Sequence, residues 1–111
     1  MNLGKHCFAS LYCCDRRLLD DQQFLIELLE RAAKEAGATV VETISKKFEP
    51  QGVTVLTLLS ESHISIHTWP ESGSAAIDVF TCGDKCEPMK AITILTSELK
   101  STQYKTDTVE R

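Results

Sequence analysis

The stretch from residue 38 to residue 82 carries four apolar, largely β-branched segments that follow one another with only short links. They span residues 38–45, 53–59, 62–69 and 74–82. The links at residues 46–52 and 70–73 contain the Pro and Gly that interrupt a strand. Links this short favour antiparallel pairing, because a parallel crossover needs a dozen or more residues. We therefore expect a mainly antiparallel sheet.

Two helical patterns and two more strands flank these segments. Residues 20–36 place apolar side chains on one helical face, with Asp20 as the expected N-cap and Gly37 as the stop. Pro88 suits the first turn of a second amphipathic helix. Further strands are predicted over residues 3–13 and 103–109. The order β-α-β-β-β-β-α-β predicts an α+β two-layer sandwich, with a mainly antiparallel sheet and two helices on one face.

The composition limits the classes of function. A chain of 111 residues, 42% hydrophobic and 25% charged, favours a single globular domain over residues 1–111. The net charge of -4, with no basic patch, argues against a nucleic-acid partner. No apolar run approaches the ~20 residues that a membrane span needs, so we expect no membrane partner.

The start of the chain and its cysteines bear on the compartment. The first residues lack the apolar region of a signal peptide. Five cysteines at irregular spacing argue against a disulfide framework and fit a reducing environment. The protein is therefore expected in the cytoplasm.

The chemistry is concentrated in residues 61–71, which combine hydroxyl groups, two imidazoles, two carboxylates and an indole. His63 and His67 would lie about 13 Å apart on a strand, at ~3.3 Å per residue, so they cannot bind one metal together. Cys82 and Cys86 have three residues between them, where zinc sites commonly have two. No metal site is expected, although a metal-binding module remains an alternative.

Ser62 lacks the glycine-flanked strand-to-helix turn of a hydrolase serine. Its hydroxyl could instead attack the carbonyl of Glu61 and form an ester, if the turn is strained and a base is near. Elimination from that ester would leave a ketone at a new N-terminus. The residues permit this self-cleavage without requiring it.

Several blocks of the chain, taken together, match one family. The strongest are Ser60-Glu61-Ser62-His63-Ile64-Ser65-Ile66-His67-Thr68-Trp69-Pro70-Glu71 and Ala75-Ala76-Ile77-Asp78-Val79-Phe80-Thr81-Cys82-Gly83-Asp84. Others are Leu11-Tyr12-Cys13-Cys14-Asp15 and Phe48-Glu49-Pro50-Gln51-Gly52-Val53-Thr54. In these blocks, and essentially end to end, the chain resembles the small prokaryotic S-adenosylmethionine decarboxylase proenzymes, which are pyruvoyl-dependent.

The resemblance implies self-cleavage between Glu61 and Ser62. Residues 1–61 would become a β subunit and residues 62–111 an α subunit, with Ser62 converted to a covalent pyruvoyl cofactor. The ketone of that group would form a Schiff base with the substrate amine and accept the electrons released with CO2. The small-molecule substrate would be S-adenosylmethionine, whose decarboxylated product donates the aminopropyl group in spermidine synthesis.

The resemblance also assigns roles to side chains and implies a homodimer of processed αβ units. Cys82 matches the proton donor of the family, and His67 and Thr54 match residues that assist processing. The substrate-binding residues would be Phe48, Trp69 and Glu71. His63 is expected either to have a structural role or to support the residues of the site, and the other cysteines are expected to have structural roles.

Three positions depart from the family pattern beside blocks expected near the pocket. Ser74 stands where relatives commonly have Tyr, Lys46 where they have His, and Val55 where they have Gly. A changed pocket with Ser62, His67 and Cys82 intact would fit decarboxylation of arginine or ornithine instead. An unprocessed, non-catalytic paralogue is a further alternative.

Overall fold

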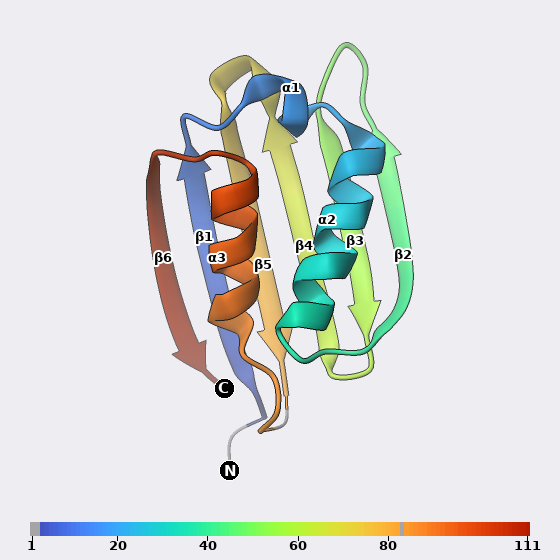
Figure 1. The fold of residues 1–111 in the computed structure, drawn as a ribbon, viewed down its shortest axis with the longest axis vertical. Helices are drawn as coiled ribbons and strands as arrows, with labels where there is room; N and C mark the ends of the chain where they lie inside the picture. Colours follow the sequence, from blue (N-terminus) through green and yellow to red (C-terminus); the bar gives the residue numbers. More distant parts are fainter. Residues whose placement is uncertain (1–2, 83) are drawn as a thin grey trace.

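The computed structural model describes residues 3–82 and 84–111, and in them one face of a six-stranded antiparallel sheet carries the helices (Figure 1). The strands are β1 (Lys5–Tyr12), β2 (Val40–Lys47), β3 (Val53–Leu59), β4 (Ser62–Trp69), β5 (Ser74–Thr81) and β6 (Gln103–Glu110). The helices are α1 (Arg16–Leu19), α2 (Gln22–Glu35) and α3 (Pro88–Glu98), with a 3-10 turn η1 (Pro70–Ser72). The strand order is β2-β3-β4-β5-β1-β6, so the predicted fold class is confirmed.

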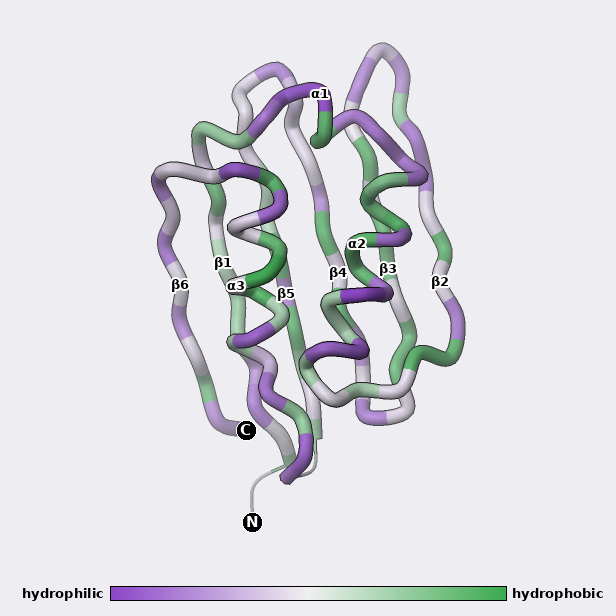
Figure 2. Tube along the Cα trace, in the orientation of Figure 1, coloured by the Kyte–Doolittle hydropathy of each residue, from purple (hydrophilic) through white to green (hydrophobic). Residues whose placement is uncertain are grey.

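The core lies between the sheet and helices α2 and α3. Figure 2 shows hydrophobic segments along the central strands and the two helices, whereas β6 is mostly hydrophilic. Alternate residues of the central strands, such as Ile64 and Ile66 of β4, are fully buried. Leu28 and Leu29 of α2 and Leu95 of α3 pack in the same core. None of the helices in the described ranges is long and apolar enough to cross a membrane.

The start of the main helix differs from the prediction. The carboxylate of Asp21, rather than that of Asp20, caps α2 by accepting a hydrogen bond of 3.0 Å from the Phe24 N–H. Asp20 instead closes the preceding short helix α1, which Asp15 caps at its N-terminus. The prediction was wrong here because two adjacent aspartates satisfy the same pattern. Gly37 ends α2 with a φ of 90°, as expected.

The opposite face of the sheet carries no helix, and we call it the open face. Large apolar side chains are exposed on it, namely Phe8, Ile44, Leu56, Leu58 and Trp69. An apolar pocket of about 450 Å³ lies there between Ile44, Leu56, Leu58 and His63. A monomer that functions alone rarely leaves such a surface uncovered.

Strand β4 runs the length of the sheet and defines two ends. At the Ser62 end, the β3–β4 turn lies beside the end of β5, and Ser62 pairs with Thr81. At the Trp69 end, Trp69 pairs with Ser74, next to η1. The two ends lie at opposite poles of the molecule in Figure 1.

Candidate active site

The carbonyl group of Glu61 is held by two hydrogen-bond donors from Cys82. The Cys82 backbone N–H donates to the Glu61 carbonyl oxygen at 3.1 Å, and the Cys82 thiol donates to the same oxygen at 2.9 Å. The antiparallel pairing of β4 with β5 brings these residues together, because Thr81 lies opposite Ser62. Two donors on one carbonyl oxygen form an arrangement that stabilises an oxyanion when the carbonyl carbon is attacked.

Ser62 follows this carbonyl directly and has an unusual backbone. Its φ is 155°, a region that residues with a Cβ seldom adopt outside functional sites. The Ser62 Oγ lies 3.2 Å from the Nδ1 of His63, within hydrogen-bond distance. A hydroxyl nucleophile, a nitrogen base and a polarised carbonyl therefore occupy the same turn.

The surroundings fix this turn in place. The Glu61 carboxylate accepts a hydrogen bond of 3.0 Å from the Thr39 N–H at the start of the segment leading to β2. Cys86 lies near the same turn, where its thiol donates to the Gly37 carbonyl oxygen at 3.6 Å. Burial raises the pKa of the Cys86 thiol, and the nearby Glu61 and Cys82 raise it further. Cys86 is therefore protonated at neutral pH.

A second cluster of predicted site residues lies toward the Trp69 end. His67 pairs with Thr54 across β3 and β4, and the Thr54 Oγ1 lies 3.0 Å from the His67 Nδ1. Trp69 and Phe48 are each 45% exposed, so both residues are available to a ligand. Glu71 lies in η1, immediately after Trp69.

The structure does not bring the two clusters together within one chain. Ser62 and His67 are five residues apart on one strand, which corresponds to about 17 Å. Ser62 and Trp69 are seven residues apart, or about 23 Å. Each chain therefore has a different cluster of predicted site residues at each end of its sheet.

The three positions that depart from the family pattern occupy different surroundings. Val55 is fully buried on the helix side of β3, so it belongs to the core and not to a pocket. Lys46 pairs with Thr54 and is exposed. Ser74 pairs with Trp69, and its hydroxyl accepts a hydrogen bond of 3.1 Å from that of Ser72. Lys46 and Ser74 thus each pair with a predicted site residue, Thr54 and Trp69 respectively.

His63 is the residue whose position the sequence reasoning underestimated. Its ring contacts the hydroxyl of Ser62 on one side and lies 6.1 Å from the ring of Phe80 on the other. Its position directly after the predicted nucleophile was the available signal. Strand alternation, which places neighbouring side chains on opposite faces, does not predict that contact.

The chain is similar to one family of known proteins. Residues 5–111 match the family described as S-adenosylmethionine decarboxylase. A protein of Synechococcus sp. (strain WH7803) named S-adenosylmethionine decarboxylase proenzyme is 58% identical over 102 residues, which are 92% of this chain and 80% of the relative. A protein of the same name from Caldicellulosiruptor saccharolyticus is 44% identical over 98% of this chain and 88% of its own length.

Solved structures share the fold. The crystal structure of the adenosylmethionine decarboxylase from Aquifex aeolicus VF5 aligns with a TM-score of 0.92 at 40% identity, covering 99% of this chain and 91% of that one. A Trypanosoma brucei AdoMetDC monomer aligns with a TM-score of 0.66 at 15% identity, over 92% of this chain and 44% of that one, which shows a shared fold alone. The match over nearly the whole chain and the shared fold place this protein in the S-adenosylmethionine decarboxylase family.

Proposed function

We propose that this chain is a proenzyme that cleaves itself between Glu61 and Ser62 and then decarboxylates S-adenosylmethionine with the resulting pyruvoyl group. The observation that carries the proposal is the Glu61 carbonyl, which accepts hydrogen bonds from the Cys82 N–H and thiol next to the hydroxyl of Ser62. Relatives at 58% and 57% identity carry the name S-adenosylmethionine decarboxylase proenzyme, which supports this substrate.

Self-cleavage begins with attack of the Ser62 Oγ on the Glu61 carbonyl carbon. His63 accepts the hydroxyl proton, and the two Cys82 donors stabilise the oxyanion. Collapse breaks the C–N bond and leaves an ester between Glu61 and the Ser62 side chain. Loss of the Ser62 α-proton to a base, the role that we propose for His67 of the partner subunit, breaks the Cβ–O bond and frees the Glu61 carboxylate. Water then replaces the nitrogen, which leaves as ammonia, and Ser62 becomes a pyruvoyl group.

The residues present fit such a group. The pyruvoyl ketone supplies an electrophile that binds a substrate amine and takes up the electrons released with CO2. Cys82 lies beside the position of Ser62 and, as a thiol, can return a proton to the substrate α-carbon. A free thiol in this role requires a reducing compartment, so we place the enzyme in the cytoplasm.

Substrate recognition falls to the Trp69 end of the sheet. The exposed rings of Phe48 and Trp69 offer flat faces for an adenine or a sulfonium cation. The carboxylate of Glu71 can accept hydrogen bonds from ribose hydroxyls. Trp69 lies about 23 Å from Ser62 in the same chain, so it cannot serve the pyruvoyl group of its own chain.

A homodimer resolves this separation, and we propose that two copies pack through their open faces. A two-fold axis that crosses β4 near Ser65, midway between Ser62 and His67, would place the Ser62 end of one chain over the Trp69 end of the other. The exposed apolar side chains Ile44, Leu56 and Leu58 would be buried in that interface. Each site would then combine Ser62 and Cys82 of one subunit with His67 and Trp69 of its partner.

Intact mass under denaturing conditions tests the cofactor. Two fragments split at Glu61/Ser62, with the C-terminal one about 17 Da lighter than hydrolysis gives, are expected. The Ser62→Ala variant should remain a single chain without activity.

Incubation of the processed protein with S-adenosylmethionine, arginine and ornithine separately, followed by identification of the amine, tests the substrate. An amine formed only from arginine or ornithine would overturn the proposal that the substrate is S-adenosylmethionine. An uncut wild-type chain would overturn the proposal that the protein is a pyruvoyl enzyme.

A further inference from the structure

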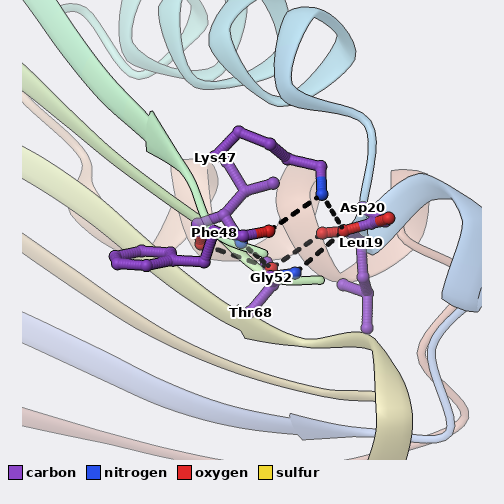
Figure 3. A network of polar contacts seen from close by, with 7 residues as sticks. Leu19, Asp20, Lys47, Phe48, Gly52 and Thr68 are labelled. Carbon is purple, nitrogen blue, oxygen red and sulfur yellow. Dashed lines mark hydrogen bonds and ion pairs between the residues drawn. The ribbon is translucent and has the colours of Figure 1, made fainter. Parts of the chain in front are cut away.

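The loop at residues 48–52 carries Phe48 and is closed by a hydrogen bond of 2.8 Å from the Phe48 N–H to the Gly52 carbonyl oxygen (Figure 3). It joins β2 to β3 at the Trp69 end of the sheet. Phe48 is 45% exposed, so contacts of its own side chain fix the ring only in part. The position of the ring must therefore depend on what holds the loop backbone.

A single carboxylate from another part of the chain holds both ends of this loop. The Asp20 Oδ1 accepts a hydrogen bond of 2.8 Å from the Gly52 N–H. The same oxygen forms an ion pair with the Lys47 Nζ at 3.0 Å. The same Lys47 ammonium donates to the Phe48 carbonyl oxygen at 3.2 Å. The hydrogen bond from Gly52, followed by that from Lys47, keeps the pKa of Asp20 below its usual range. Figure 3 shows these groups converging on Asp20.

The residue before Asp20 is fixed to strand β4. The buried Thr68 hydroxyl donates to the Leu19 carbonyl oxygen at 2.7 Å and accepts from the Val53 N–H at 2.9 Å. Thr68 directly precedes Trp69, the second exposed aromatic residue of the proposed pocket. The support for Phe48 is therefore tied to the strand that carries Trp69.

Gly52 makes the contact with Asp20 possible. Its φ of 108° is unfavourable for any residue with a Cβ, and an added Cβ would lie 3.3 Å from the Thr68 carbonyl oxygen. Only glycine turns its N–H toward Asp20 at this place without strain. The arrangement is thus built by three separate segments of the chain.

We propose that Asp20 is a positioning residue for substrate binding, which sets the place of the Phe48 ring relative to Trp69. This inference rests on the proposed function, since it assumes that the two rings receive the substrate. Asp20 would act through the loop backbone and would not touch the substrate. Its loss should therefore weaken substrate binding while leaving self-cleavage at the other end of the sheet intact.

Steady-state kinetics with S-adenosylmethionine separate these effects. Asp20→Ala should raise KM roughly tenfold to a hundredfold, with kcat and the extent of processing close to wild type, because a hydrogen-bonded charge is removed from the loop alone. Asp20→Asn, which keeps an oxygen for the Gly52 N–H, should recover part of this loss. Arg31→Gln, which breaks the similarly exposed Arg31–Glu98 ion pair between α2 and α3, is the matched control and should leave KM unchanged.

A binding measurement without turnover distinguishes this inference from the proposed function. Trp69 is the only tryptophan of the chain, so its fluorescence reports on the pocket directly. In the Ser62→Ala background, S-adenosylmethionine should quench this fluorescence, and Asp20→Ala should shift the midpoint to higher concentration. An unshifted midpoint, or a KM equal to that of wild type, would overturn the role of Asp20. No response to S-adenosylmethionine in either protein would instead overturn the proposed substrate, and this inference with it.

Discussion

Two inactive variants should restore one another if each active site is shared between subunits. Ser62→Ala removes the nucleophile at one end of β4, and His67→Ala removes a base at the other end, about 17 Å away. Expressed alone, the first should remain uncut. The second should cleave roughly a hundredfold to ten-thousandfold more slowly, as expected for loss of a general base.

Co-expression in equal amounts gives mixed dimers. In such a dimer the intact Ser62 of the His67→Ala chain faces the intact His67 of the Ser62→Ala chain, and the other site carries both substitutions. Random pairing puts about one half of the His67→Ala chains in mixed dimers, so about one half of them should be cut. Decarboxylase activity should reach about a quarter of the wild-type value, because one site in four is intact.

Intact mass resolves the products without tags, because a C-terminal fragment that carries both the pyruvoyl group and the His67→Ala substitution forms rapidly only by rescue. The matched control is the Ser62→Ala/His67→Ala double variant co-expressed with His67→Ala, which offers no intact His67 and should give no rescue. If the His67→Ala chain stays uncut beside the Ser62→Ala chain, the shared site is wrong. The same conclusion follows if His67→Ala cleaves normally by itself.

Three further predictions follow from the geometry. Leu56→Asp places a charge on the open face, so sedimentation velocity should show a monomer, and intact mass should show that it stays uncut. A processed dimer would contradict the proposed interface. Cys82→Ala leaves only the backbone donor on the Glu61 carbonyl, so the rate of cleavage, measured by intact mass, should fall by about a hundredfold. An unchanged rate would exclude the thiol from stabilising the oxyanion. The pKa of Asp20 is lower in the folded protein than in the unfolded chain, where it is about 4. The ionised carboxylate therefore stabilises the fold above about pH 4, and this stability is lost as the pH falls through the folded pKa. Melting temperatures measured below about pH 4 should decline less steeply in Asp20→Asn than in wild type.

The strands and main helices were predictable because each has a strong local pattern. The alternation in β4 and β5 and the apolar face of α2 reflect the sheet and helix periods directly. The short helix α1 was missed, since four residues carry too little periodicity. The choice between Asp20 and Asp21 as cap depends on the distant Gly52, which no local pattern reports.

The resemblance named the members of the candidate site but not their arrangement. The resemblance named Ser62, His67 and Cys82 together and implied a dimer, without stating which subunit each residue comes from. Strand geometry separates His67 from Ser62 by the same argument that prevents His63 and His67 from sharing a metal. The contact of Cys82 with the Glu61 carbonyl depends on the register of β4 against β5, which the hydrophobic pattern alone does not fix to one residue.

The strand order decides what a cut at Glu61/Ser62 can do to the molecule. The N-terminal fragment would keep β1, β2 and β3, and the C-terminal fragment β4, β5 and β6, yet β1 lies between β5 and β6. Among the described residues, three of the five strand ladders, β3 with β4, β5 with β1 and β1 with β6, therefore join one fragment to the other. A strand of the N-terminal fragment thus lies between two strands of the C-terminal fragment. Maturation would nick the backbone without releasing either piece, and separating them would require unfolding the whole sheet.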